Sequence, residues 1–212
     1  MSDPFHPLVP YSLVREFRTP LAIGRDPSTM TWTADIDFGR FGGAPEMVLP
    51  ATYPEWLGGG AFTRAHGVRF PYVGGAMARG IASVAMVEAL AKVGALGFFG
   101  AAGLRPEVLE KEIEVLAAKL GSRYPWGSNL IHSHGDARLE DAAVDIYLRH
   151  RVTKVSAAAF VDLTPALVRY AVTGLSRGAD GSVVRRNHVF AKISRPEVVG
   201  RFLSPPPGSI LD

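Results

Sequence analysis

Two glycine turns are the first feature of this sequence that could do chemistry. Gly74-Gly75 follows the apolar, β-prone run at 70–73, and Gly100 opens a second glycine-rich turn after the apolar run at 95–99. Glycine reaches backbone dihedral angles that are closed to other residues. Each turn follows a strand-like segment, and parallel strands bind their ligands at their carboxyl ends. The spacing therefore predicts that the two turns flank one binding site.

A polar loop, His132-Ser-His134-Gly-Asp136, supplies a second group of reactive side chains. It follows the apolar run at 126–131, at the end of a predicted strand. A histidine at this position could donate a proton or contact a phosphate group. The two histidines lack the HxxxH spacing on a helix that a zinc site favours, and the nearest acid, Asp136, lies in the same loop. We therefore expect no metal site.

Strands and helices that alternate from residue 69 onward must position these groups. Apolar residues recur at helical spacing over 83–93, and Gly94 is a typical residue to end that helix. The predicted strands cover 70–73, 95–99, 126–131, 154–160 and 189–193. The predicted helices cover 83–93, 105–120 and 139–149, and two more begin at Thr164-Pro165 and at Ser194-Arg195. This alternation implies a parallel sheet, either closed as a (β/α)₈ barrel or open as a doubly wound sheet.

Two segments depart from this alternation of strands and helices. The turn Gly178-Ala-Asp180-Gly181 predicts a hairpin-like excursion before the fifth strand. Residues 1–66 are rich in proline and glycine, and their most regular piece, 29–38, alternates as a half-buried strand does. The sequence thus predicts an N-terminal cap of short strands and loops over 1–66, an α/β domain over 67–203 and a proline-rich tail or truncation point over 204–212.

The composition limits the function classes. The chain has 212 residues, of which 47% are hydrophobic, and no cysteine, so disulfides and thiolate chemistry are excluded. Its formal net charge of +3 is small and its basic residues are scattered, which does not indicate a nucleic-acid partner. No window is as apolar as a membrane span, and the first ten residues, MSDPFHPLVP, lack the blocks of a signal peptide. We expect a cytoplasmic protein without a membrane partner.

Five blocks of the sequence together resemble one enzyme family. FPYVGGAMARGIAS, LGFFGAAGL, GSNLIHS, AAAFVDLTPALVRY and AKISRPEVVGRFL are similar to successive blocks of the flavin-dependent enoyl reductases that act in trans with polyunsaturated fatty-acid and polyketide synthases. These enzymes belong to the nitronate monooxygenase (2-nitropropane dioxygenase) superfamily. The resemblance covers roughly Trp56 to Pro206. It implies a (β/α)₈ TIM barrel, bound FMN, and hydride transfer from NADPH to an enoyl thioester on an acyl carrier protein.

The resemblance also implies which residues contact the flavin. The turn after the first strand, here Gly75, Ala76, Met77 and Ala78, lies against the flavin ring in that family, and the asparagine of the third block, here Asn129, bonds the edge of the ring. Small residues with free N–H groups let the main chain approach a flat ring, and a carboxamide both donates and accepts. Without the resemblance, the same residues equally fit a tight turn, core packing and a loop-capping amide.

Lys192, at the end of the fifth predicted strand, is a further candidate. It could stabilise negative charge at the N1–O2 edge of a reduced flavin, although a surface lysine fits its position equally well. The family's general-acid histidine, in a Gly-Gly-His block, and its two phosphate-binding loops have no counterpart in these residues. The catalytic residue is therefore not identified by the sequence.

The length of the matching region bears on activity. About 140 residues follow Arg69, against ~250 in a complete barrel. The sequence thus predicts a partial barrel, made of the first five or so βα units, with little activity on its own. We expect it to need a C-terminal barrel half or a second copy of itself.

Three functions remain open at this point. The first is the N-terminal half of an FMN-dependent enoyl reductase that acts in trans on enoyl thioesters carried by an acyl carrier protein. The second is a nitronate monooxygenase, which shares the flavin site but passes electrons to oxygen. The third is a non-catalytic partner-binding or scaffold component of a synthase complex.

Overall fold

The computed structural model describes residues 11–211, which form two compact units that divide between Gly59 and Gly60. The first ten residues and Asp212 lie outside this range, as do the expectations that concern them. Helix α2 (Gly60–His66) belongs to the second unit. Its Phe62 packs against the cluster around Val68, so the division comes before residue 67, where the change in composition places the domain boundary.

The first unit is a small antiparallel sheet. Its strand order is β2-β1-β3, and hydrogen bonds from Arg40 to Asp35 (2.6 Å) and to Asp26 (3.3 Å) brace the loops on one side. Its expected strand at 29–38 is shorter in the structure, because Met30 has a positive φ of 60° and the strand begins only after it. The elements are α1 (Tyr11–Val14), β1 (Leu21–Arg25), β2 (Trp32–Asp35), η1 (Phe38–Phe41), β3 (Met47–Leu49) and η2 (Pro54–Trp56).

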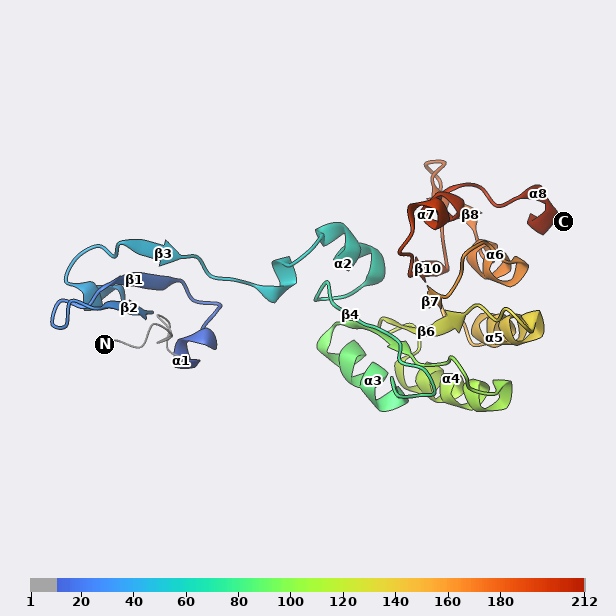
Figure 1. Ribbon diagram of the computed structural model, residues 1–212, viewed down its shortest axis with the longest axis horizontal. Helices are drawn as coiled ribbons and strands as arrows, with labels where there is room; N and C mark the ends of the chain where they lie inside the picture. The colour runs from blue at the N-terminus through green and yellow to red at the C-terminus, as the bar shows by residue number, and fades with distance from the viewer. Residues whose placement is uncertain (1–10, 212) are drawn as a thin grey trace. The chain divides into compact units, whose positions relative to one another are not determined.

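The second unit is built on five parallel strands in the order β10-β7-β6-β5-β4. Each strand pairs with the next strand of this sheet along the chain, as the alternating pattern predicts. Figure 1 shows the sheet with its helices in succession along one side. The strands are β4 (Val73–Gly74), β5 (Leu96–Phe99), β6 (Trp126–Ile131), β7 (Lys154–Ala158) and β10 (His188–Ala191).

Helices connect these strands and pack on their neighbours in order. Contacts join α3 to α4, α4 to α5 and α5 to α6, so consecutive helices lie side by side on one face of the sheet. A doubly wound sheet would reverse its strand order and carry helices on both faces. The curled sheet is therefore part of a (β/α)₈ barrel, which confirms the predicted fold. The helices are α3 (Val84–Val93), α4 (Pro106–Leu120), α5 (Ala137–Arg149), α6 (Pro165–Val172), α7 (Pro196–Leu203) and α8 (Gly208–Leu211).

The helix ends follow local chemistry. Ser83 caps α3 by accepting a hydrogen bond from the N–H of Met86, and Gly94 ends the helix at a φ of 90°. Thr164 caps α6 in the same way, with Pro165 in the first turn as predicted. Between α6 and β10 lies the predicted excursion, a hairpin of β8 (Ser176–Arg177) and β9 (Val183–Val184).

Strand β10 covers His188–Ala191 rather than the predicted 189–193, and two other strand boundaries differ from the prediction for identifiable reasons. The first strand shortens to β4 because Pro71 has no N–H and the N–H groups of Arg69 and Phe70 both donate to Gly94 O. Strand β7 ends at Ala158 rather than at residue 160, because Ala159 takes a positive φ of 65°. No helix within residues 11–211 is long and apolar enough to span a bilayer.

The two faces of the sheet carry separate clusters. The helix-facing side joins Phe99, Leu130 and Val155 to the helices in the larger cluster. On the other side, Phe98 packs with Phe190 across the sheet, with their ring centroids 5.1 Å apart. An open face of this kind is the interior side of a barrel. Because the five strands are parallel, the carboxyl ends of β4, β6 and β10 lie at one common edge of the sheet.

Candidate functional site

At the carboxyl edge of the sheet, backbone hydrogen bonds join the second glycine turn to residues 79–82, which follow the first turn. The N–H of Arg79 donates to Ala102 O at 2.8 Å, and that of Gly80 donates to Gly100 O at 2.8 Å. In return, the N–H of Gly100 donates to Ala82 O at 3.0 Å. The structure thus holds the second turn against the segment that follows the first turn.

Gly100 is essential to this junction. A Cβ at this position would lie 1.6 Å from the carbonyl oxygen of Met77, which no side chain can accommodate. Gly75 is the opposite case, because a Cβ there meets no heavy atom within 4 Å. Sequence reasoning assigned Gly100 no separate role, and the turn Gly100-Ala-Ala-Gly103 was its only local signal.

The predicted flavin-contacting turn presents a row of free donors. Among residues 11–211, no backbone or side-chain acceptor pairs with the N–H groups of Gly75, Ala76, Met77 and Ala78. Met77 is 41% exposed, whereas Ala76 packs against the interior cluster. Four consecutive donors on small or flexible residues can bond the acceptor edge of a planar ligand. That these residues bind a cofactor remains a prediction.

Asn129 is buried near the carboxyl end of β6. It is 6% exposed, and its Nδ2 donates to Ser156 O on β7 at 2.8 Å. No residue in the described part of the chain donates to its Oδ1. Tyr147 of α5 donates to the backbone oxygen of Asn129 at 2.5 Å and accepts from Ser128 Oγ at 3.0 Å. Burial raises the pKa of the Tyr147 phenol, so it stays a donor that holds β6 in place.

Lys192 lies directly after β10 and is exposed. Its N–H donates to Ala157 O at 2.9 Å, which holds it at the same carboxyl edge. Strands β4 and β10 are the two outer strands of the sheet, so Lys192 and the turn at 75–78 stand at opposite sides of that edge. No interaction given for the described residues joins Lys192 to Asn129 or to this turn.

The polar loop after β6 is organised by an acid that the sequence did not single out. His132 Nδ1 lies 3.0 Å from Oε2 of Glu140, which is 3% exposed. The ring of His134 packs edge-on against that of His132, with their centroids 4.3 Å apart. Asp136 instead caps α5 and pairs with Arg138, which lowers the pKa of its carboxyl. The acid in the same loop therefore does not serve the histidines.

Nothing in the sequence identified Glu140 as the partner of His132. It falls in the first turn of α5, where an acid is favourable in any helix, and eight positions separate it from His132. Only the packing of the helix against β6 brings its carboxylate to the imidazole.

Two residues that follow strands at this edge of the sheet have a positive φ. Of the four non-glycine residues with positive φ within 11–211, Arg79 (55°) follows β4 and Ala159 (65°) follows β7. Residues held in such conformations cost about 1–3 kcal/mol each and cluster at functional sites.

One group of possible metal ligands lies elsewhere. Within 11–211, the ligand atoms of Glu110, Glu114 and His150 approach to within 4.8 Å of one another. Glu110 already pairs with Arg149 and with His150, and hydrogen bonds from His150 and Arg149 lower its pKa. Glu110 therefore links α4 to the end of α5 through Arg149 and His150.

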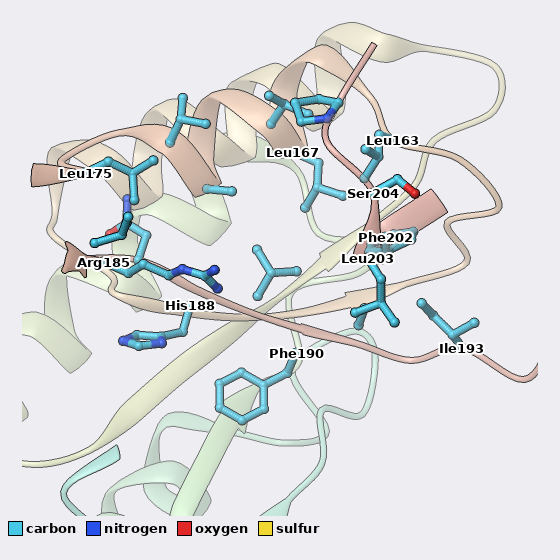
Figure 2. A pocket seen from close by; sticks show the side chains of 18 of the residues that line it. Leu163, Leu167, Leu175, Arg185, His188, Phe190, Ile193, Phe202, Leu203 and Ser204 are labelled. Carbon is cyan, nitrogen blue, oxygen red and sulfur yellow. The ribbon is translucent and has the colours of Figure 1, made fainter. Parts of the chain in front are cut away.

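A larger cavity of about 810 Å³ opens beside β10. Figure 2 shows the side chains of His188 and Phe190 on one side of the strand and those of Phe202 and Leu203, from α7, on the other. The ring of His66 lies 5.1 Å from that of His188, and burial lowers the pKa of both. The cavity is mostly apolar and runs along an outer strand, which the sequence did not indicate. A smaller cavity of about 180 Å³ lies next to Asn129.

Comparisons with known proteins find sequence similarity to parts of polyketide biosynthesis proteins and of a polyunsaturated fatty acid synthase. Polyketide biosynthesis protein ThaF of Burkholderia thailandensis is 43% identical over 165 residues, which cover 78% of this chain and 14% of ThaF. Polyketide biosynthesis protein PksE of Bacillus subtilis is 41% identical over 157 residues, which cover 74% of this chain and 20% of PksE. A polyunsaturated fatty acid synthase component of Thraustochytrium sp. is 41% identical over 197 residues, which cover 93% of this chain and 13% of that protein. The chain therefore spans a small part of these relatives. No family model matches it.

One solved structure has a similar fold over most of this chain. The enoyl reductase domain of MlnA, from the macrolactin biosynthesis cluster of Bacillus amyloliquefaciens, superposes with a TM-score of 0.71 at 37% identity. The match covers 73% of this chain and 36% of that domain. The chain is therefore homologous to part of this enoyl reductase domain and to parts of the polyketide and polyunsaturated fatty-acid synthase proteins above.

Proposed function

We propose that this chain is part of an FMN-dependent enoyl reductase that reduces enoyl thioesters in polyketide or polyunsaturated fatty-acid synthesis. The observation that carries the proposal is the match to the MlnA enoyl reductase domain, at 37% identity and a TM-score of 0.71. It is supported by the arrangement of the carboxyl edge, where parallel α/β folds bind their ligands.

The residues at this edge fit a flavin ring. The turn at 75–78 offers four free N–H groups, and Asn129 keeps its Oδ1 free while Tyr147 and Ser156 hold it in place. A flavin presents alternating acceptors and a donor along one edge, which backbone N–H groups and a carboxamide can match. When bound, the flavin would supply hydride chemistry, and this chain's residues would orient the ring.

Further partners follow from the same proposal. Lys192, an exposed cation at the carboxyl edge, would stabilise charge on the reduced ring. The electron donor would be NAD(P)H and the substrate an enoyl group on an acyl carrier protein, in the cytoplasm. The outer strand β10 has one unpaired side, so a C-terminal barrel half or a second copy of the chain would complete the sheet.

The test is an absorption spectrum of the purified chain after incubation with FMN and desalting, with and without a polypeptide that supplies the other barrel half. Retained flavin bands in either sample, together with NAD(P)H-dependent loss of an enoyl thioester, are the expected result. A protein that stays colourless in both samples would refute the proposal. Consumption of a nitroalkane in preference to the enoyl thioester would instead indicate a nitronate monooxygenase.

A pair of glycine variants separates binding from folding. A Cβ at Gly75 meets no atom within 4 Å, so Gly75→Val should leave the fold intact but fill the space that a ring needs. Gly43→Val, at an equally open position in the first unit, is the matched control. We expect Gly75→Val to lose bound flavin and Gly43→Val to retain it. Equal retention by both would remove the turn from the site.

A further inference from the structure

A cluster of basic side chains lies where β7 and β10 begin, at the amino edge of the sheet. Lys154 and His188 are the first residues of these strands and pair in register. Residues in register share a face of the sheet, and Figure 2 shows His188 on the same side of β10 as Phe190, which packs on the interior side. Lys154 and His188 therefore both face the interior side. We call the following four residues the basic cluster: His66, Lys154, Arg185 and His188.

His66 joins the basic cluster from the end of α2. Its ring lies 5.1 Å from that of His188 and 4.8 Å from that of Phe190. Its Nδ1 is buried, and within residues 11–211 it is the only buried side-chain nitrogen or oxygen that lacks a hydrogen-bond partner. A buried polar atom costs free energy unless water, an ion or another bound group satisfies it. The unpaired Nδ1 therefore points to a bound group at this place.

No acidic side chain balances the charge of the basic cluster. The charged groups that act on His66 are His188 and Lys154, and those that act on His188 are Lys154 and Arg185. Among the described residues, no acid forms an ion pair with any of the four. Burial and repulsion from these cations lower the pKa of both histidines, and burial lowers the pKa of Lys154. Partly buried cations without a counter-charge are unfavourable, so an anion would relieve them.

The basic cluster is open to solvent through the larger cavity. His66, Arg185 and His188 line this space of about 810 Å³. Arg185 is exposed, whereas Lys154 and the two histidines are half-buried. Clefts lined by charges of one sign raise the local concentration of counter-ions. An anion can therefore reach the cluster and become partly desolvated there.

We propose that the basic cluster binds one oxyanion group, a carboxylate or a phosphate. Such a group accepts several hydrogen bonds, and the N–H donors of lysine, arginine and protonated histidine bind it most strongly. The site lies at the amino edge of the sheet, whereas the flavin is proposed to bind at the carboxyl edge, so this inference goes beyond the proposed function and does not rest on it. The oxyanion comes either from solution or from an acidic side chain on a segment that pairs with the open side of β10.

The first test uses acetate and inorganic phosphate as probes. Nitrogen-15 NMR of the histidine-labelled chain would follow each ring between about pH 5 and pH 8. Either probe should raise the pKa of His66 and His188 relative to sodium chloride of equal ionic strength, because a bound anion favours the protonated rings. Binding should accordingly tighten as the pH falls. His150, which lies 3.2 Å from Glu110, is the control and should not respond. Equal pKa values of His66 and His188 in chloride and in both probes would overturn the proposal.

A pair of lysine variants tests the place of binding. Lys154→Met removes one cation of the basic cluster and breaks no ion pair, so the variant should fold. It should weaken phosphate binding about tenfold or more, since a hydrogen bond to a charged group is lost. The matched control is Lys119→Met on α4, whose ammonium bonds Glu88 at 2.6 Å and which should bind phosphate as the wild-type chain does. Equal weakening by both variants, or none by Lys154→Met, would overturn the site.

The last test separates the two sources of the oxyanion. The NMR titration is repeated with a polypeptide that supplies the other barrel half. Raised pKa values of His66 and His188 in chloride, with no further response to phosphate, would support an acidic side chain of that polypeptide. A response to phosphate that persists would support a free anion. Values that stay low and ignore phosphate in this sample would overturn the proposal. Flavin retained by the same samples reports separately on the proposed function.

Discussion

Replacing Gly100 with alanine is expected to break the junction between the second glycine turn and the segment that follows the first turn. The new Cβ would lie 1.6 Å from the carbonyl oxygen of Met77 and 2.7 Å from its carbonyl carbon, where side-chain contacts under 3.0 Å essentially never occur. Both neighbours are backbone atoms, so no side chain can rotate away. The two segments must therefore move apart, and the hydrogen bonds between them are lost.

The size of the effect follows from these contacts. The junction contains the bonds from Gly80 to Gly100 O (2.8 Å) and from Gly100 to Ala82 O (3.0 Å). Each contributes about 1 kcal/mol, and forcing a methyl group into a packed position costs about 1–3 kcal/mol. We expect Gly100→Ala to lower the free energy of unfolding by about 3–5 kcal/mol, a large share of the stability of an ordinary domain.

Urea unfolding followed by tryptophan fluorescence and circular dichroism would measure this loss. The matched control is Gly75→Ala, one strand away, where the new methyl group meets no atom within 4 Å and should change the stability by less than ~0.5 kcal/mol. The reasoning would be refuted if Gly100→Ala were as stable as the wild-type chain, or if both variants lost the same amount.

Three further predictions concern stability. Tyr147→Phe removes the donor to Asn129 O and should destabilise the chain by about 1–3 kcal/mol in urea unfolding, because that buried oxygen loses a partner. Hydrogen bonds from Lys119 and Lys92 lower the pKa of Glu88 to about 2, below its unfolded value; the carboxylate therefore stabilises the fold above about pH 4.5 and loses this effect as the pH falls toward 2. The urea midpoints of wild type and Glu88→Gln should accordingly differ at pH 7 and converge near pH 2. Burial lowers the pKa of Lys154, so its charge is unfavourable in the fold, and Lys154→Met should raise the thermal midpoint.

Local patterns accounted for most of the barrel unit. The strand over 126–131 and the helix over 84–93 lie where alternation, helical spacing and a glycine stop predict them. Each such signal depends on residues a few positions apart, whose conformations are coupled through neighbouring backbone bonds. Of the boundaries that moved, those of β4 and β7 depend on Gly94 O and on the backbone of Ala159, which no periodicity encodes.

The sequence predicted only some of the residues of the candidate site. The turn at 75–78 and Asn129 were singled out by a resemblance, and the structure adds their free donors and their supports. It also adds Gly100, whose role comes from the approach of a carbonyl more than twenty residues earlier in the chain. Contacts of this kind are fixed by how loops pack, which residue types alone do not reveal.

The sequence by itself determined the parallel βα order, the helix caps and the positions of the glycine turns, because each is set by short-range sterics and hydrogen bonding. Only the tertiary structure decided that the helices share one face and that Glu140 serves His132. The spacing along the chain made Asp136 the nearest acid, but its carboxylate is taken up by capping α5 and by Arg138. The packing of α5 against β6 instead carries a buried carboxylate to the imidazole, since two groups on separate elements meet only when the core between those elements forms.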